Sequence, residues 1–278
     1  MRKFKEFLLN SSMIIATLIT CGLLVFLLGA IIMRGAPHVT TRLVTTQTSY
    51  INETIGILPN ILNTLYIIFV TMIIVLPLGV CAAIYITEYA KNKRVMSIIS
   101  FATETLTGIP SIIFGLVGML FFTQLAGLKN GILAGGLTLV MMVLPTIVTN
   151  TRESLLTVPQ SYREGSLALG SGKWHMIRTV VLPNAIDGIL TGCILAVGRI
   201  TGESAALLYT AGFGFRLMSF IESLQSSSAT LTVALYAYAT VEGEFDVAFA
   251  IAVILMAITL VLNLSAGHFT RKLKSRRS

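Results

Sequence analysis

The chain has 278 residues, of which 55% are hydrophobic and only 12% are charged, and its formal net charge is +8. Ordinary soluble domains carry about 25% charged residues, so this chain has too few charges to cover a water-facing surface. The composition therefore excludes a soluble enzyme, a disordered chain and a disulfide scaffold, and it indicates an integral membrane protein. The three cysteines and three histidines are scattered along the sequence, a pattern that predicts neither a metal site nor a cofactor site.

A membrane-spanning helix needs about 20 consecutive, mostly apolar residues. Six such runs follow one another along the chain, at residues 12–33, 61–86, 107–125, 131–149, 186–208 and 246–264. The first run is longer than the apolar part of a secretory signal peptide and has no clear cleavage site after it, so we expect it to remain as an anchor. The sequence thus predicts an all-α integral membrane protein with six transmembrane helices.

Six spans place both termini on the same side of the membrane. If that side is the cytoplasm, Arg199 lies within a span and the outer loops hold only four of the 20 lysines and arginines, namely Arg34, Arg42, Lys129 and Arg216. An excess of basic residues in cytoplasmic loops is the usual orientation signal of membrane proteins. We therefore expect both termini to be cytoplasmic, and we interpret the positive charge as a sign of topology and not of nucleic-acid binding.

The connection between the fourth and fifth spans, at about residues 159–184, is too long for a simple turn. Ser161 and Glu164 fit a capping box, which predicts the start of a short helix. The glycines around Gly170 should end this helix, and a second helical stretch should follow and close at Pro183. One interpretation of such a segment is an amphipathic helix that lies on the lipid headgroups.

The same connection resembles the EAA loop of ABC-importer permeases, whose pattern is E-A-A-x3-G-x9-I-x-L-P. Small residues replace both alanines and valine replaces the isoleucine, and the residues that carry the resemblance are Glu164, Gly165, Ser166, Gly170, Leu182 and Pro183. In that family the loop is a coupling helix that docks into a groove on a cytoplasmic ATPase. The resemblance implies a type I (MetI-like) permease core over residues 56–267. Residues 1–55 would then hold a cytoplasmic tail, the first span and an outer loop, and residues 268–278 a basic cytoplasmic tail.

The fifth predicted span carries two ionisable residues, Arg199 and Glu203. Counted from the start of the span, Arg199 lies about 20 Å along the helix axis, a little past the midplane of a hydrocarbon core about 30 Å thick. An ionised arginine there costs at least about 2.5 kcal/mol, so it should face the bundle interior or a wet path. Glu203 is expected one turn further along the same face. The pair is interpreted either as a structural ion pair or as an anion site, because a guanidinium binds phosphate or carboxylate oxygens with two parallel donors.

Four segments of the chain resemble the PstA-type permease of phosphate ABC importers, at residues 58–65, 85–90, 108–116 and 198–212. The resemblance implies that Arg199 and Glu203 occupy positions implicated in phosphate passage. It also implies a bacterial or archaeal plasma membrane (inner membrane) and three kinds of partner: a second homologous permease, two cytoplasmic ABC ATPase subunits and an extracytoplasmic phosphate-binding protein. ATP hydrolysis would belong to the ATPases, so no catalytic residue is expected in this chain.

The residues alone leave other functions open. A permease for another oxyanion, such as phosphonate, sulfate or molybdate, would use the same arginine. A stand-alone secondary transporter would use Arg199 and Glu203 as a proton-coupled anion relay, but the two halves of the chain show no convincing inverted repeat. An integral membrane enzyme is disfavoured because no His/Cys cluster or paired-carboxylate motif lies at the membrane boundary. We interpret Glu88 and Glu104 as interfacial charges, and residues 213–238 as a half-span or a surface helix near the outer gate.

Overall fold

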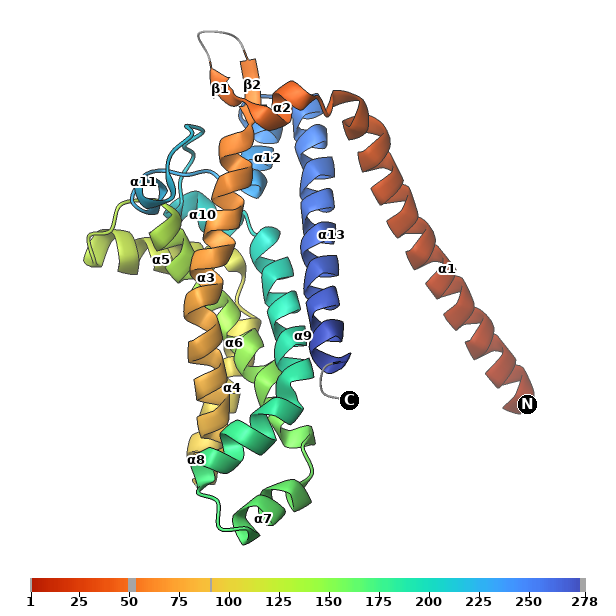
Figure 1. The fold of residues 1–278 in the computed structure, drawn as a ribbon. Coiled ribbons are helices and arrows are strands. Elements are labelled where there is room, and N and C mark those ends of the chain that lie inside the picture. Colours follow the sequence, from red (N-terminus) through yellow and green to blue (C-terminus); the bar gives the residue numbers. More distant parts are fainter. Residues whose placement is uncertain (1, 50–53, 91, 276–278) are drawn as a thin grey trace.

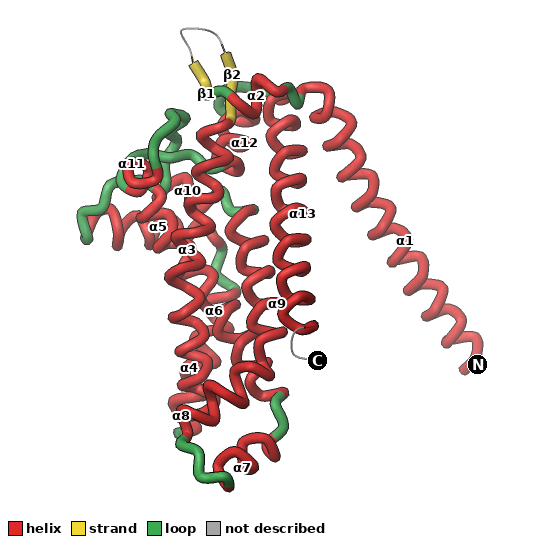
Figure 2. Tube along the Cα trace, viewed as in Figure 1, coloured by secondary structure: helices red, strands yellow, loops and turns green. Residues whose placement is uncertain are grey.

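The computed structural model describes residues 2–49, 54–90 and 92–275, and most of them are helical (Figures 1 and 2). The long helices are α1 (Arg2–Gly35), α3 (Leu58–Ile84), α6 (Ile132–Thr157), α9 (Leu182–Thr201) and α13 (Phe245–Ser275). The shorter helices are α2 (Thr41–Thr45), α4 (Lys93–Thr107), α5 (Ser111–Gly118), α7 (Gln160–Ala168), α8 (Lys173–Met176), α10 (Ala205–Thr210), α11 (Phe220–Leu224) and α12 (Leu231–Thr240). The basic tail expected at residues 268–278 runs into residues 276–278, which lie outside the described part.

Three π-helical turns extend these helices, at Tyr85–Tyr89, Met119–Leu125 and Ile177–Val181, and a 3-10 turn at Ala36–His38 follows α1. An antiparallel hairpin of β1 (Gln47–Ser49) and β2 (Thr54–Ile57) lies at one end of the bundle, and α7 lies at the opposite end (Figure 1). We call these the hairpin end and the α7 end. The positions of the charged residues are described below relative to these two ends.

Five helical segments of the described chain are long and apolar enough to cross a membrane, namely Leu9–His38, Leu58–Tyr89, Ile132–Thr157, Lys173–Thr201 and Phe245–Gly267. A further pair, Met96–Thr107 and Ser111–Leu125, passes the same test together but bends by 103° at the break between its two helices. The predicted all-α membrane fold is confirmed, and it has six spans when the bent pair counts as one.

The predicted third span, residues 107–125, has the wrong bounds, because it begins on the last residue of one helix and continues into another. α4 ends at Thr107, Pro110 has extended backbone, and α5 begins only at Ser111. Proline has no backbone N–H, and its ring disfavours a helical conformation at the residue before it. Apolar composition alone suggested one helix through Pro110, but the proline separates two helices that point in different directions.

Helices α3, α6 and α9 lie at the centre of the bundle (Figure 1), and the fully buried side chains there include Ile67, Leu139, Met142, Ile147 and Ile200. Two glycines bring α3 and α6 close together. A Cβ atom on Gly79 would lie 2.5 Å from Cγ2 of Ile147, and one on Gly136 would lie 2.9 Å from Cγ1 of Val70. Without a hydrophobic drive between helices in lipid, such close approach supplies much of the packing energy of a membrane bundle.

Helix α1 diverges from the rest of the bundle and meets α13 near the hairpin end (Figure 1). There the guanidinium of Arg34 lies 5.4 Å from the ring centroid of Phe249, and Gly35 packs against the backbone of Phe249. None of the apolar window within Leu9–His38 is buried inside the chain. Lipid or another membrane subunit must therefore cover this helix.

Candidate functional site

The predicted coupling loop lies at the α7 end, where α7 and α8 reverse the chain toward the bundle (Figure 1). We call α7, α8 and the residues between them the coupling turn. α7 begins at Gln160, and no side chain caps its first turn, so the expected capping box of Ser161 and Glu164 is wrong. The extended backbone of Pro159, with ψ of 140°, already directs the chain into the helix one residue earlier. The prediction that glycines end this helix is confirmed, because α7 ends at Ala168 and Gly170 has a φ of +83°, a conformation that favours glycine.

The residues that carry the EAA resemblance are arranged around this turn. Glu164, Gly165 and Gly170 are exposed and Ser166 is partly buried. A Cβ atom on Gly165 or Gly170 would meet nothing within 4 Å. This side of the turn is therefore free to receive a partner.

Leu182 and Pro183 are partly buried at the start of α9. Pro183 does not close the second helical stretch, contrary to the prediction, because helix continues over Lys173–Thr201. The π-helical turn Ile177–Val181 ends two residues before the proline. A wider turn of this kind accommodates the missing N–H and the bulk of the ring without ending the helix.

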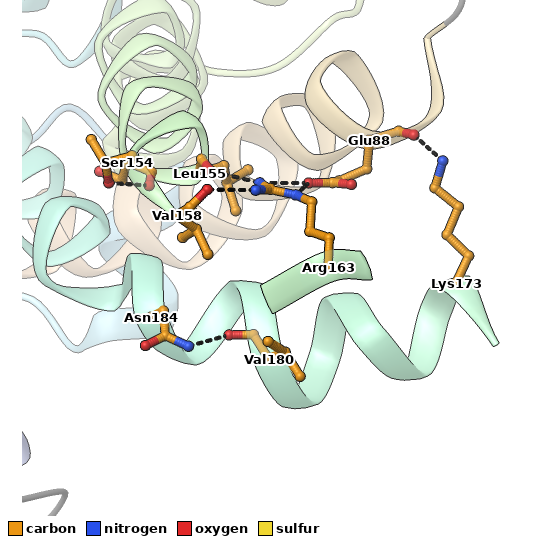
Figure 3. Close-up of polar contacts among 9 residues, drawn as sticks. Glu88, Ser154, Leu155, Val158, Arg163, Lys173, Val180 and Asn184 are labelled. Atoms are coloured by element: carbon orange, nitrogen blue, oxygen red, sulfur yellow. Dashed lines mark hydrogen bonds and ion pairs between the residues drawn. The ribbon is translucent and has the colours of Figure 1, made fainter. Parts of the chain in front are cut away.

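Arg163 is the buried side chain of α7, and it joins this helix to the ends of two others (Figure 3). Its guanidinium lies 3.0 Å from Oε1 of Glu88, through both Nε and Nη2. The same guanidinium donates to the backbone carbonyl of Val158 at 2.6 Å and to that of Leu155 at 2.7 Å. Glu88 belongs to the π-helical turn that extends α3, and the two carbonyls lie at the end of α6, so one side chain ties three helices together.

Lys173, the first residue of α8, reaches the same place from the other side of the turn (Figure 3). Its ammonium donates to the backbone carbonyl of Glu88 and lies 4.8 Å from the ring centroid of Tyr89. A cavity of about 540 Å³ lies at this junction, and Glu88, Arg163 and Lys173 are among its lining residues. We call these three residues the Glu88 junction.

The sequence reasoning missed the Glu88 junction. It interpreted Glu88 as an interfacial charge and counted Arg163 and Lys173 only as topology signals. The hydrogen bond between Arg163 and Glu88 joins residues 75 positions apart, a separation at which no local pattern reveals contact. The available signal was that Arg163 directly precedes Glu164 in one segment with a family resemblance and that Glu88 lies in another.

The fifth predicted span also differs from its expectation. α9 ends at Thr201, and the chain breaks at Gly202 before α10 begins at Ala205. Arg199 therefore lies in the last turn of α9, and Glu203 lies in the break and not one helical turn further along the same face. No ion pair joins these two side chains within the part of the chain that the structure describes.

Glu203 is 9% exposed and held by backbone groups. Its Oε1 accepts a hydrogen bond from the backbone N–H of Ala206 at 3.1 Å, and its own carbonyl accepts one from Oγ1 of Thr232 at 2.6 Å. Arg199 is partly buried, and a Cβ atom on neighbouring Gly198 would meet nothing within 4 Å. Arg199 is thus partly exposed next to a glycine that leaves open space, whereas the carboxyl of Glu203 is bound to the backbone of α10.

The segment expected as a half-span or a surface helix, at residues 213–238, contains one short helix and most of a second. α11 is five residues long and α12, of ten residues, is apolar but too short to span a membrane. The N-terminus of α12 is clamped by α3, where the side-chain amides of Asn60 and Asn63 donate to the carbonyl of Ala229 and Leu231 N–H donates to Thr64. This clamp and the bond from Thr232 position the break that holds Glu203.

The geometry contains no metal centre, since the described residues include no group of three or more His, Cys, Asp or Glu side chains that could hold an ion. What it does contain is an exposed helical turn at one end of a membrane bundle and, further along the bundle, an arginine that forms no ion pair with the described residues. That combination fits a passage through a membrane moved by another subunit.

The family model described as "Binding-protein-dependent transport system inner membrane component" matches residues 75–275, and the chain belongs to this family. Among curated proteins, the probable ABC transporter permease YqgI of Bacillus subtilis is 39% identical over 80% of this chain and 75% of its own length. The phosphate transport system permease PstA of Haemophilus influenzae is 35% identical over 78% of this chain and 75% of its own length. The resemblance to PstA-type permeases is confirmed.

Solved structures agree with this assignment at the level of the fold. The chain matches the alginate ABC transporter crystallised with its alginate-bound periplasmic protein at a TM-score of 0.71, with 15% identity over 98% of this chain and 97% of that one. It matches the inward-facing methionine ABC transporter MetNI at a TM-score of 0.60, with 20% identity over 78% of this chain and 94% of that one. The MetI-like permease fold is confirmed, and the chain is a membrane permease component of an ABC importer.

Proposed function

We propose that this permease carries inorganic phosphate, forming half of the pathway in an ATP-driven importer. The observation that carries the proposal is Arg199, a cation in the fifth span without a counter-charge in the described chain, next to open space at Gly198. A permanently charged guanidinium in a membrane needs an anion or water beside it. Glu203 lies in the adjacent wall and lowers the net charge of the site, so that a bound oxyanion can leave again. The similarity to the PstA permease of Haemophilus influenzae supports phosphate as this anion.

The complete importer requires partners that this chain lacks. A second, homologous permease would complete the pathway beside Arg199, and it or lipid would cover the free apolar surface of α1. An extracytoplasmic phosphate-binding protein would deliver the substrate at the hairpin end, and two ABC ATPases would bind at the α7 end. This orientation puts both termini in the cytoplasm, in a bacterial or archaeal plasma membrane, with residues 56–267 as the permease core.

The exposed turn at the α7 end is the proposed docking surface for the ATPase. Leu169 is 90% exposed and Trp174 is 60% exposed, next to the exposed Glu164 and Gly165. Apolar side chains of this size, left uncovered beside a charged residue, are typical of a protein interface. A helix held by its neighbours and inserted into an ATPase would move the spans as rigid bodies when the ATPases close.

The test of the phosphate proposal is uptake by the reconstituted importer with Arg199→Gln. We expect phosphate uptake to fall by about a hundredfold, because the variant loses the charge-assisted pair of donors, worth about 3 kcal/mol. Arg178→Gln, an exposed arginine on the π-helical turn, is the matched control and should retain full uptake. Normal uptake by Arg199→Gln would remove the anion site, and equal uptake of sulfate or molybdate by the native importer would remove the assignment to phosphate.

ATPase docking is tested separately by co-purification in mild detergent. Gly170→Asp places a side chain on a backbone with φ of +83°, which costs about 1 kcal/mol or more of strain, and adds a charge to the exposed turn. We expect loss of most of the ATPase from the purified complex, whereas Gly172→Asp, at a negative φ of −70°, should retain more of it. Equal recovery of the ATPase with both variants would contradict docking through Gly170.

A further inference from the structure

Helix α7 is attached to the membrane bundle through very few side chains, whereas the other arm of the turn is anchored by the buried side chain of Met176 in α8. Within α7, Arg163 is the residue that is buried, whereas the others are exposed or partly exposed. A helix that packs on a core normally buries an apolar stripe, and α7 instead buries one charged group. Its position relative to the spans is therefore set by the contacts of that guanidinium.

Those contacts fix both the orientation of the guanidinium and its distance from the ends of α3 and α6. Its donors are shared among Glu88, at the end of α3, and the carbonyls of Leu155 and Val158, at the end of α6. The planar guanidinium has a fixed fork of donors, so three acceptors on two helices leave it little freedom to rotate. Both carbonyls lie at the C-terminal end of α6, where that of Leu155 also accepts the N–H of Val158 at 3.4 Å, so the arginine adds donors at a helix end that has few of its own.

The pair is also shielded from water. The side chains of Arg163 and Glu88 are 11% and 6% exposed, and charges so shielded attract each other more strongly than surface pairs do. Lys173 holds the backbone of the same glutamate from the α8 side. The two arms of the turn thus meet at Glu88, in the π-helical turn that extends α3, as Figure 3 shows.

We propose that the Glu88 junction is the rigid joint through which movement of the coupling turn reaches α3 and α6. Arg163 and Glu88 act as positioning residues, because they touch neither the substrate nor the exposed face of the turn. The joint makes the turn and the ends of both helices move as one body, so that ATPase closure tilts the spans instead of bending the turn. This inference rests on the proposed function in one respect, namely that an ATPase drives the turn.

The first test measures coupling in the reconstituted importer with Arg163→Gln and with Glu88→Gln. We expect both complexes to retain their ATPases and to hydrolyse ATP, while phosphate imported per ATP falls by about tenfold. Arg163→Lys keeps the positive charge but loses the forked donors of the guanidinium. Its ratio of phosphate imported per ATP should lie between the native value and that of Arg163→Gln. Arg178→Gln and Glu153→Gln, two exposed charges on neighbouring segments, are the matched controls and should keep the native ratio. An unchanged ratio in Arg163→Gln and Glu88→Gln would overturn the joint.

The second test does not depend on the substrate. Spin labels replace Leu169 at the tip of the turn and Ile73 on the exposed side of α3, in a chain whose Cys21, Cys81 and Cys193 are changed to serine. With the native junction, the distance between the labels should stay the same before and after trapping with ATP and vanadate. With Glu88→Gln the distribution of distances between the labels should be broader both before and after trapping, and its mean should shift on trapping. A distribution that is as narrow in Glu88→Gln as in the native chain, with the same mean before and after trapping, would contradict the proposed joint. This holds even if the importer carries another anion.

Discussion

Two places in the described part of the chain each bury, wholly or partly, an arginine and a glutamate, and these charges are neutralised differently in the two. At the α7 end, Arg163 meets Glu88 at 3.0 Å and completes its hydrogen bonds with carbonyls of the same chain. At the break after α9, Glu203 is held by the N–H of Ala206, and the structure describes no ion pair between it and Arg199. In the first place, the charges are compensated by groups of the same chain, and we call it the closed set. In the second place, the structure describes no counter-charge for the arginine, and we call it the open site.

This difference distinguishes charges that hold the helices together from a charge that is left for another role. A charge compensated within its own chain needs nothing further, so it serves to hold helices together. A charge in a membrane without a compensating partner needs one from outside the chain, and a passing anion is the partner that we propose for Arg199. Residue type alone does not distinguish the two cases, because each place contains one arginine and one glutamate.

The largest expected effect comes from breaking the closed set. Arg163→Leu leaves the carboxylate of Glu88 buried without a counter-charge, and we expect it to lower the free energy of unfolding by about 3–5 kcal/mol. Arg199→Leu breaks no ion pair within the described chain, so we expect a change of less than about 1 kcal/mol. Thermal unfolding of the detergent-solubilised chain measures both variants.

The double variant Glu88→Leu, Arg163→Leu sharpens this prediction. Replacing a buried pair by apolar residues is often close to neutral, so the double variant should recover more than half of the lost stability. Similar losses for Arg163→Leu and Arg199→Leu would show that the two places do not differ in the way described here.

Sequence reasoning reached the bundle because each span is a long apolar run, and such runs need no knowledge of neighbours. It reached the coupling turn because glycines such as Gly170, and the EAA-like residues around it, lie close together along the chain. It failed where a break interrupted a run: Pro110 and Gly202 were treated as features within a helix, although each follows the end of one. The position of Glu203 was wrong for that reason, since the estimate of one turn assumed a continuous helix.

Sequence reasoning also failed for contacts between residues that lie far apart along the chain. Residues such as Glu88 and Arg163 become neighbours only after α3, α6 and α7 have packed, so their pairing belongs to tertiary structure. The same holds for Thr232, whose hydroxyl bonds to the carbonyl of Glu203 from a separate helix. Helical periodicity describes one element at a time and carries no information about such pairs.

A smaller effect tests what holds the open site in place. Thr232→Val keeps the shape of the side chain but removes the hydrogen bond to Glu203, which leaves a buried carbonyl without this donor and should cost about 1–2 kcal/mol. Thr240→Val, on the same helix, removes only an exposed bond to the carbonyl of Tyr236 and should cost less than about 0.5 kcal/mol. Hydrogen exchange at residues 202–206 should rise in the first variant only, and equal exchange in both would mean that Thr232 does not fix the break.

The smallest effect concerns an exposed charge, the third way in which this chain holds a carboxylate. Hydrogen bonds from the backbone N–H and hydroxyl of Ser219 lower the pKa of Glu222, which caps α11. A carboxyl whose pKa is lower in the folded state contributes stability above its ordinary pKa and loses it as the pH falls through the lowered value. Protection of residues 220–224 from hydrogen exchange, corrected for the intrinsic rate, should therefore weaken as the pH falls from about 7 to below about 4. Ser219→Ala removes the hydroxyl, so protection should be lower at neutral pH and should depend less on pH. A native pH dependence in that variant would mean that the hydroxyl of Ser219 contributes nothing and that its backbone N–H, which the variant keeps, is sufficient to lower the pKa of Glu222.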